Sequence, residues 1–273
     1  MAEEPTREVY PNASLRLVTA EFRFPFSPRL AGSESLNALV PLVAERLPIP
    51  EPAGQTIELS SLSPQPQLVP SPELGYRFLT RDRMTAVTVQ AGRIAIETTV
   101  YERWESFRDL IGWTLDVVGV QLGAIVAIDR VGLRYIDEIR VPGEAPLAQK
   151  WTPYVDERLL APAQISGGQE LRAMQGVLQL GTDENSELVM RYGTLEGHIV
   201  ADTGPLRLPT PPGQGPFFSV DIDSYWVRPP ERQDEFDVGI ALAIAERLHA
   251  PVGELFERAI TDRLRDEVLR RTP

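Results

Sequence analysis

The sequence predicts an α+β fold in which antiparallel sheets are each packed on a long amphipathic helix. Strand patterns cluster in two groups, and a long helical pattern follows each group (75–100 then 103–122, and 170–193 then 234–268). Strands that alternate with helices would instead predict a parallel sheet. Because the same order occurs twice, we expect two weakly duplicated halves, 1–145 and 146–273, as separate units or as one continuous domain.

The first elements are predicted from hydrophobic periodicity. Residues 14–24 alternate apolar side chains with arginines, which predicts a strand. Residues 33–47 have apolar residues at helical spacing, with Ser33 or Ser35 as the expected N-cap. Pro41 lies inside this pattern and predicts a kink, a break or a shorter helix.

A polar segment and a β meander follow. Residues 48–72 are rich in Pro, Ser and Gln, which predicts a long loop with one short strand at 56–59. Turn signals then separate three strand patterns (75–79, 85–89 and 93–100).

The helix at 103–122 has the clearest 3.6-residue period of the first half, and Gly123 is its expected C-terminal cap. A strand at 127–141 follows it. Further along, the patterns predict a short helix or turn, three strands and a C-terminal helical region that divides near Pro251 (151–160; 170–180, 187–193 and 217–222; 234–268).

Composition restricts the class of function. The chain has 273 residues, a net charge of −12 and a sequence pI near 4.8. Phosphate binding requires concentrated positive charge, so direct binding to nucleic acid or to an anionic membrane surface is not expected. An acidic surface suits a basic partner instead. The polar N-terminus and the lack of a long apolar run predict a cytoplasmic protein without a membrane segment.

Residues that perform chemistry are scarce. The chain has no Cys and two His, which excludes disulfides and thiolate sites and argues against a multi-His metal centre. G-x-S-x-G, Walker and Rossmann motifs are absent from the sequence. We therefore predict no catalytic residues, no metal and no cofactor, and we favour a non-enzyme without excluding an enzyme.

The stretch RVGLRYIDEI at 130–139 poses the main question. Its alternation places Tyr135 and Asp137 on one face of a strand, and Arg134 and Glu138 on the other. A covered Arg134 requires a carboxylate partner, since an unpaired buried charge is costly. The candidates are Asp129, Asp221, Asp223 and Glu97. The pair is either an internal ion pair, or Arg134 lines a groove that recognises an acidic peptide end or small anion.

Two other motifs are candidates for binding. Asp221 and Asp223 in VDID share one strand face, where they bind a divalent cation, act as an acid–base pair, or simply meet solvent. His249 follows Glu246 by three residues, as in the Glu-x-x-His motif of di-metal bundles, but this spacing occurs once. The alternative for His249 is packing against the sheet with a bond to a carbonyl.

Five segments resemble segments found in the same order in a sporadically distributed family of uncharacterised bacterial proteins. They are AEFRF at 20–24, YERWESF at 101–107, RVGLRYIDEI at 130–139, VDID at 220–223 and RLHAPVGELFERAIT at 247–261. The family motif V-x-L-R-Y-I-N has Asn where this chain has Asp137. An L-H…F-E-x-x-I-T ending is matched by Leu248, His249, Phe256, Glu257, Ile260 and Thr261.

The resemblance implies an accessory protein in bacterial defence, in stress or beside a toxin. Together these observations predict a non-catalytic binding protein that holds a protein or peptide partner, as a homo-oligomer, with a sheet edge available to add a strand. The alternative is a small-molecule sensor or enzyme with a pocket between sheet and helix. The predicted binding residues are Arg134, Tyr135, Asp137, Asp221, Asp223 and His249.

Overall fold

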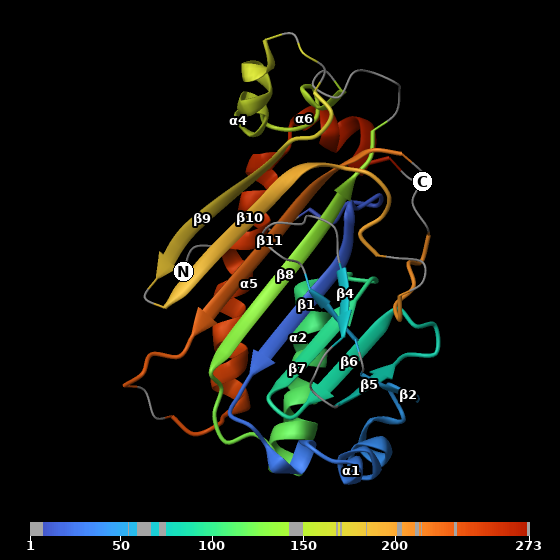
Figure 1. The fold of residues 1–273 in the computed structure, drawn as a ribbon, viewed down its shortest axis with the longest axis vertical. Coiled ribbons are helices and arrows are strands. Elements are labelled where there is room, and N and C mark those ends of the chain that lie inside the picture. The colour runs from blue at the N-terminus through green and yellow to red at the C-terminus, as the bar shows by residue number, and fades with distance from the viewer. Residues whose placement is uncertain are drawn as a thin grey trace.

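The architecture is one large antiparallel sheet with helices on one of its faces. The computed structural model describes residues 8–53, 55–58, 67–70, 75–141, 150–167, 169, 171–183, 185–200, 204–210, 213, 215–231 and 234–271. Nine strands form the sheet in the order β2-β5-β6-β7-β1-β8-β11-β10-β9, and each described pair is antiparallel (Figure 1). The mixed class and the antiparallel pairing predicted from the sequence are confirmed.

The strands of this sheet are β1 (Leu15–Arg23), β2 (Ile49–Pro52), β5 (Gly75–Leu79), β6 (Thr85–Gln90), β7 (Arg93–Thr98), β8 (Arg130–Ile139), β9 (Gln175–Asp183), β10 (Ser186–Leu195) and β11 (Phe217–Val227). A separate hairpin joins β3 (Gln55–Glu58) to β4 (Gln67–Pro70). The predicted loop at 48–72 therefore contains three short strands, of which the sequence pattern indicated only one.

The centre of the sheet joins the two predicted halves. β8 pairs with β1 on one side and with β11 on the other, so that Tyr135 lies between Val18 and Ile222. Because β8 belongs to the segment 1–145 and β11 to 146–273, strands of both halves form one continuous sheet. The weak duplication of the halves stays a prediction.

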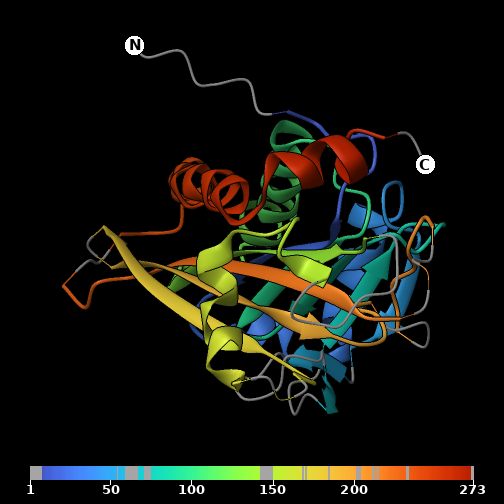
Figure 2. The ribbon, with the colours of Figure 1, turned by 90° about the horizontal axis from the view of Figure 1, so that it is seen from above.

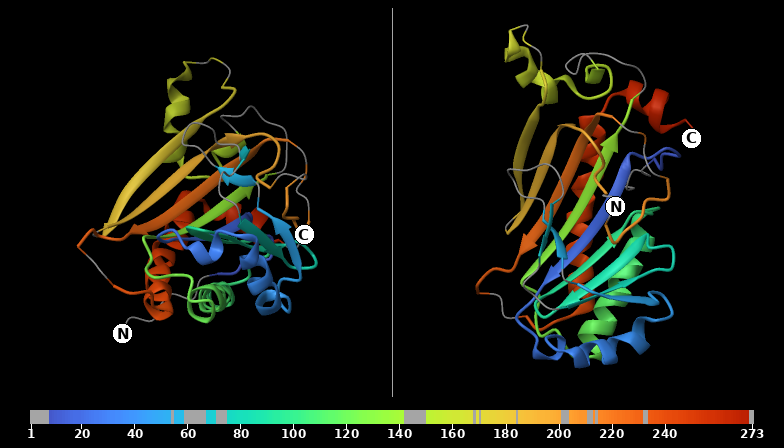
Figure 3. Two further views of the ribbon diagram at one scale, coloured as in Figure 1. Left: turned by 60° about the horizontal axis from the view of Figure 1, so that its bottom comes forward. Right: turned by 45° about the vertical axis from the view of Figure 1, so that its right-hand side comes forward.

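The helices are α1 (Ser33–Val43), α2 (Trp104–Leu115), α4 (Glu157–Leu160), α5 (Val238–Ala259) and α6 (Asp262–Leu264). α2 and α5 lie side by side on one face of the sheet, and the β3–β4 hairpin lies on the other side (Figures 2 and 3). We call these the helix face and the open face. A π-helical turn extends α2 (Asp116–Gln121), and Gly123 follows it with φ 54°, as a C-terminal cap requires. Among the described residues, no helix has both the length and the apolar character needed to cross a membrane.

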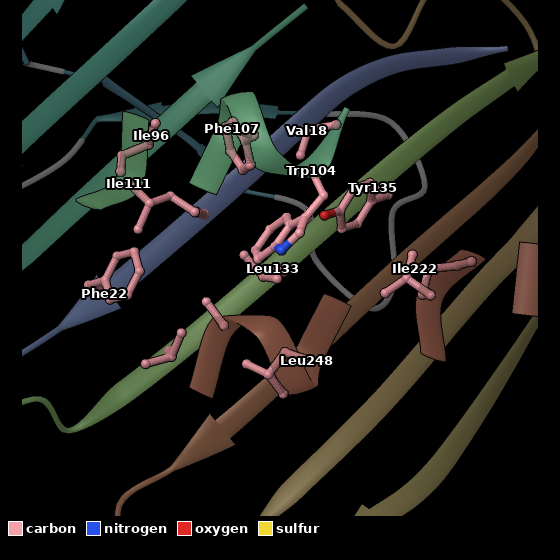
Figure 4. Packing of buried hydrophobic residues seen from close by; sticks show 14 of the residues in the cluster. Val18, Phe22, Ile96, Trp104, Phe107, Ile111, Leu133, Tyr135, Ile222 and Leu248 are labelled. Carbon is pink, nitrogen blue, oxygen red and sulfur yellow. The ribbon is translucent and has the colours of Figure 1, made fainter. Parts of the chain in front are cut away.

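The main core lies between the helix face and these two helices, and a smaller apolar cluster that includes Leu17, Ile136, Ile199 and Phe217 lies on the open face. Apolar side chains alternate along the central strands, and those that face α2 and α5 are buried. Figure 4 shows this packing, with Val18, Phe22, Leu133 and Ile222 from the sheet, Ile111 from α2 and Leu248 from α5. The core therefore fixes which face of β8 each of its residues occupies.

Two details of the helices differ from the prediction. Gly32, rather than Ser33 or Ser35, occupies the N-cap position of α1, and the Ser35 hydroxyl donates to the Gly32 carbonyl. α5 continues through Pro251 and ends at Ile260, whose backbone is extended and forms a bridge with Val155. A tertiary contact, and not the proline, therefore divides the C-terminal helical region.

Candidate functional site

The strand pleat divides the six predicted binding residues between two faces. The Tyr135 hydroxyl lies 2.9 Å from Nδ1 of His249 on α5, so Tyr135 faces the helices. Neighbouring residues of a strand point to opposite faces, and Arg134 therefore lies on the open face. Asp223 is opposite Arg134 in the register and shares that face with Asp221. The structure thus brings together Arg134, Asp221 and Asp223, and separately Tyr135 and His249.

Arg134 forms an ion pair with Asp221. Its Nε donates to Oδ1 at 2.7 Å, and its Nη2 donates to the other carboxylate oxygen, so the contact is bidentate. The side chains are 18% and 10% exposed, which places the pair largely out of water. The open face is thus not the solvated face expected as an alternative for Asp221. Asp221 is the partner that the burial of Arg134 requires.

The ion pairs continue across the open face. Arg93 contacts Glu21 at 2.7 Å, Arg130 contacts Glu21 at 2.8 Å, and Arg130 lies 3.8 Å from Asp223. Burial opposes ionisation of Glu21, yet Arg93, Arg23 and Arg130 lower its pKa below the usual value. We call the six residues the open-face ladder: Arg93, Glu21, Arg130, Asp223, Arg134 and Asp221.

The open-face ladder neutralises itself. It contains three arginines and three carboxylates, and each arginine has a carboxylate within 4 Å. Burial raises the pKa of Asp223, although Arg130 and Arg134 oppose the shift. An anion that bound Arg134 would have to displace Asp221. The arrangement therefore favours a structural role for Arg134.

An aromatic cluster surrounds His249 on the helix face. The ring of Trp104 stacks on His249 with centroids 4.3 Å apart and 10° between the planes, and Tyr101 meets the Tyr135 ring edge-on. Glu246 pairs with Arg108 at 3.2 Å. A polar partner of His249 is the phenol of Tyr135; the bond to a carbonyl stays a prediction. This geometry favours packing over metal ligation.

Removing the Tyr135 hydroxyl should weaken this cluster modestly. Tyr135→Phe removes the hydrogen bond to His249 and leaves the ring packing, so we expect a loss of about 1 kcal/mol in the free energy of unfolding. Urea denaturation measures this value. An unchanged midpoint would contradict the assignment of this hydrogen bond to the folded state.

Asp137 is a buried carboxyl on the helix face. It is 6% exposed and accepts a 2.7 Å hydrogen bond from the Ser14 hydroxyl. Burial raises the pKa of Asp137 to about 7, with further contributions from the charges of Asp221 and Glu257, while Ser14 and Arg16 act against the shift. Asp137 therefore changes charge near neutral pH, which an exposed aspartate does not do.

A second ion cluster, missed by the sequence argument, fastens a loop to the open face. The Glu138 side chain is fully buried and accepts from Arg140 Nε at 2.6 Å and from the Ile199 backbone N–H at 3.1 Å. Arg140 also donates to the Gly215 carbonyl at 2.7 Å and approaches His198. The signal was present, since Glu138 and Arg140 share one strand face, but the loop partners are distant in sequence.

The edge strand β9 is exposed over almost its whole length. Among the described strands it pairs only with β10, and its apolar side chains Val177, Leu178 and Leu180 are 56%, 38% and 43% exposed. The segment from Gln175 to Thr182 has no charged residue. Proteins normally protect such an edge with charge, proline, a β-bulge or a short length. In β9 the register shift and the charge of Asp183 lie at the C-terminal end, so Gln175 to Gly181 is the part of the edge without such protection.

The opposite edge is protected. β2 has four residues, Ile49–Pro52, and two of them are prolines, which lack the N–H that a further strand would need. Glu51 in the same strand accepts from Arg83 at 2.8 Å. The contrast between β2 and β9 identifies β9 as the edge that this sheet leaves available.

Other kinds of site find little support in the described part of the chain. No group of three or more His, Cys, Asp or Glu residues there is arranged to hold a metal ion. A pocket of about 120 Å³ lies between the ends of β6 and β7 and the start of α2, and none of the six predicted binding residues lines it. Ligand pockets usually have volumes of about 300 Å³ or more.

Comparison of the sequence with models of known protein families gives no match, and comparison with curated proteins gives none either. The resemblance to the sporadically distributed bacterial family therefore stays a prediction from the motifs.

Proposed function

We propose that this chain is a non-catalytic interaction protein that binds a protein partner by strand addition at β9. The exposed edge of β9, which is uncharged from Gln175 to Thr182, is the observation on which the proposal rests. In strand addition, the backbone N–H and C=O groups of the edge supply affinity, and alternate side chains supply specificity. Leu178 and Leu180 project on the helix face, and Val177 projects on the open face.

The separation of polar groups on the two faces also supports this proposal over the alternative. A sensor or enzyme pocket between sheet and helix would require Arg134, Tyr135, Asp137 and Asp223 to converge. Arg134 and Asp223 lie on the open face, away from the helices, and Arg134 is paired with Asp221. A converging set of polar groups is what a small-molecule site needs.

One observation favours a second candidate, an anion or an acidic peptide end bound on the open face. Arg191 of β10 lies opposite Asp221, and its Nε and Nη1 atoms are buried without a hydrogen-bond partner in the described part of the chain. Buried guanidinium N–H groups without acceptors are costly. If an anion satisfies them, a carboxylate ligand should stabilise the wild-type chain against heat, and Arg191→Gln should abolish that stabilisation.

The biological setting is part of the proposal. An accessory role in bacterial defence or beside a toxin rests on the motif resemblance. The net charge of −12 suggests that a partner other than a second copy of this chain is basic, and the polar N-terminus suggests a cytoplasmic location. These statements extend the proposal for β9 and do not depend on one another.

Affinity purification from the native host tests the proposal. A Leu178→Lys, Leu180→Lys double variant places charges on the exposed edge, and Val120→Lys is the control because Val120 is 58% exposed in the π-helical turn after α2. We expect a protein, which includes the host's own untagged copy of this chain, to co-purify with the wild type and with Val120→Lys and to be lost with the double variant. An enriched metabolite without a protein, or a partner retained by the double variant, would contradict the proposal.

A further inference from the structure

We infer that the strand added to β9 belongs to a second copy of this chain, which joins two sheets through an antiparallel β9–β9 pair. This inference rests on the proposed function and names the partner at that edge.

The β10 register shows where the side chains of β9 point. Leu178 is opposite Met190, and Leu180 is opposite Leu188. Met190 and Leu188 are buried in the core on the helix face. Leu178 and Leu180 therefore continue the row of apolar side chains of the helix-face core from β10 onto β9. No further described strand lies beside β9 to cover them.

The sequence of β9 is complementary to itself. Directly opposite residues of an antiparallel pair share a face, so a two-fold axis that is perpendicular to the sheet places one residue against its own copy. With Gln179 at the axis, Leu178 lies opposite the second copy's Leu180, and Leu180 lies opposite the second copy's Leu178. Both pairs fall on the helix face, where they continue the apolar row. Registers centred on Leu178 or Leu180 pair only one leucine with leucine.

Charge also favours a second copy over a charged partner. Two chains with net charge −12 repel one another, yet the one charged residue of β9, Asp183, lies at the end of the strand, opposite the second copy's neutral Gln175. Between Gln175 and Thr182, a basic or acidic partner would find no charged side chain of β9 to recognise. Gln179, the residue at the axis, is neutral, and its Nε2 donates to Glu187 of β10 at 2.7 Å; like charges at this position would be destabilising.

The protected β2 edge limits the assembly to a closed pair. Each sheet has two edges, and the prolines of β2 block addition there. A pairing surface on one edge with two-fold symmetry gives dimers, whereas pairing on both edges would give open fibres. The junction is nine residues long, which is small beside the roughly 1,200 Å² or more of standard interfaces, so we expect a reversible dimer.

Sedimentation velocity over a wide range of protein concentration tests the dimer. We expect a reversible monomer–dimer equilibrium for the wild type and for Val120→Lys. The Leu178→Lys, Leu180→Lys variant places like charges opposite one another and should weaken the dimer about tenfold or more, with an unchanged far-ultraviolet spectrum. A wild type that stays monomeric, or a double variant that dimerises as well as the wild type, would overturn the inference.

Single cysteines test the register on an otherwise unchanged chain. The sequence has no Cys, so any disulfide arises from the introduced residue. Gln179→Cys should form a disulfide-linked dimer on mild oxidation, because opposite Cβ atoms lie about 4.5–5.5 Å apart. Leu178→Cys should link poorly to itself but should link to Leu180→Cys when the two proteins are mixed. Equal linking at all three positions would contradict this register.

These measurements separate the inference from the proposed function. If the wild type is monomeric but a purified protein partner is lost from the double variant, the second copy is wrong and strand addition at β9 stands. If the partner binds the double variant as well as the wild type, strand addition at β9 is wrong, whatever the oligomeric state.

Discussion

Asp137→Asn is expected to stabilise the protein by up to about 4 kcal/mol near pH 8 and to leave its stability near pH 4 almost unchanged. The reason is the position of Asp137 in the helix-face core, where burial raises its pKa from 3.8 to about 7. Asparagine has nearly the same shape and never ionises, and its carbonyl oxygen can still accept the hydrogen bond from Ser14. Denaturant unfolding at both pH values measures the difference.

The sign follows from the protons bound in each state. Below pH 3.8 both the folded and the unfolded forms of Asp137 are protonated, so the carboxyl adds no pH dependence. Between pH 3.8 and about 7 the unfolded chain loses this proton while the folded chain keeps it, and the wild type loses stability as the pH rises. Above that window the loss in the free energy of unfolding stays constant. Asparagine does not ionise, so the variant avoids this entire loss.

The control variant removes a carboxylate charge at a solvent-exposed position. Asp109→Asn changes an exposed carboxylate on α2 and gives the same change in net charge. We expect it to leave the difference in stability between the two pH values unaltered. An Asp137→Asn gain that is equal at both pH values would contradict the buried titration. Asp137→Asn also places an asparagine at the position where the motif that this segment resembles has one.

Local pattern was sufficient for most elements of the fold. Period-two alternation located β1, β5, β6, β7 and β8, because a half-buried strand requires it. The start of β11 was predicted correctly, but its C-terminal end was predicted five residues too early, since Ser224 and Tyr225 do not continue a simple apolar alternation although Ser224 is buried. The end of α5 depends on a contact between Ile260 and Val155, more than a hundred residues apart, and no local signal encodes it.

For the candidate site, the sequence predicted the kind of partner that Arg134 requires but not which residue it is. Burial of Arg134 required a carboxylate, and the sequence offered Asp221 among four candidates. The choice among them depends on the β8–β11 register, which a single sequence does not determine. The register also explains why Tyr135 and Arg134, adjacent in sequence, do not share a site. β9 is exposed because it is the last strand in the order of the sheet, and local hydrophobic periodicity does not reveal strand order.

Arg134→Met is expected to lower the free energy of unfolding by about 3 kcal/mol or more. Methionine fills similar space but leaves the carboxylate of Asp221 without its bidentate partner, and that carboxylate is 10% exposed. An ion that loses its partner out of water is costly, whereas removing both partners of a buried pair is often close to neutral. The double variant Arg134→Met, Asp221→Leu should therefore recover most of the loss. Urea unfolding of the four chains gives the coupling energy.

The outcome of this cycle decides between the two roles of Arg134. The exposed pair Arg258–Glu254 on α5 is the control, since its side chains are 72% and 64% exposed and its removal should change stability little. If Arg134→Met leaves the melting temperature unchanged but abolishes binding of a partner or anion, Arg134 serves a ligand and the structural role is wrong. If the double variant is as unstable as the single one, the arginine stabilises the open-face ladder through Asp223 and Glu21, and the pairing with Asp221 is secondary.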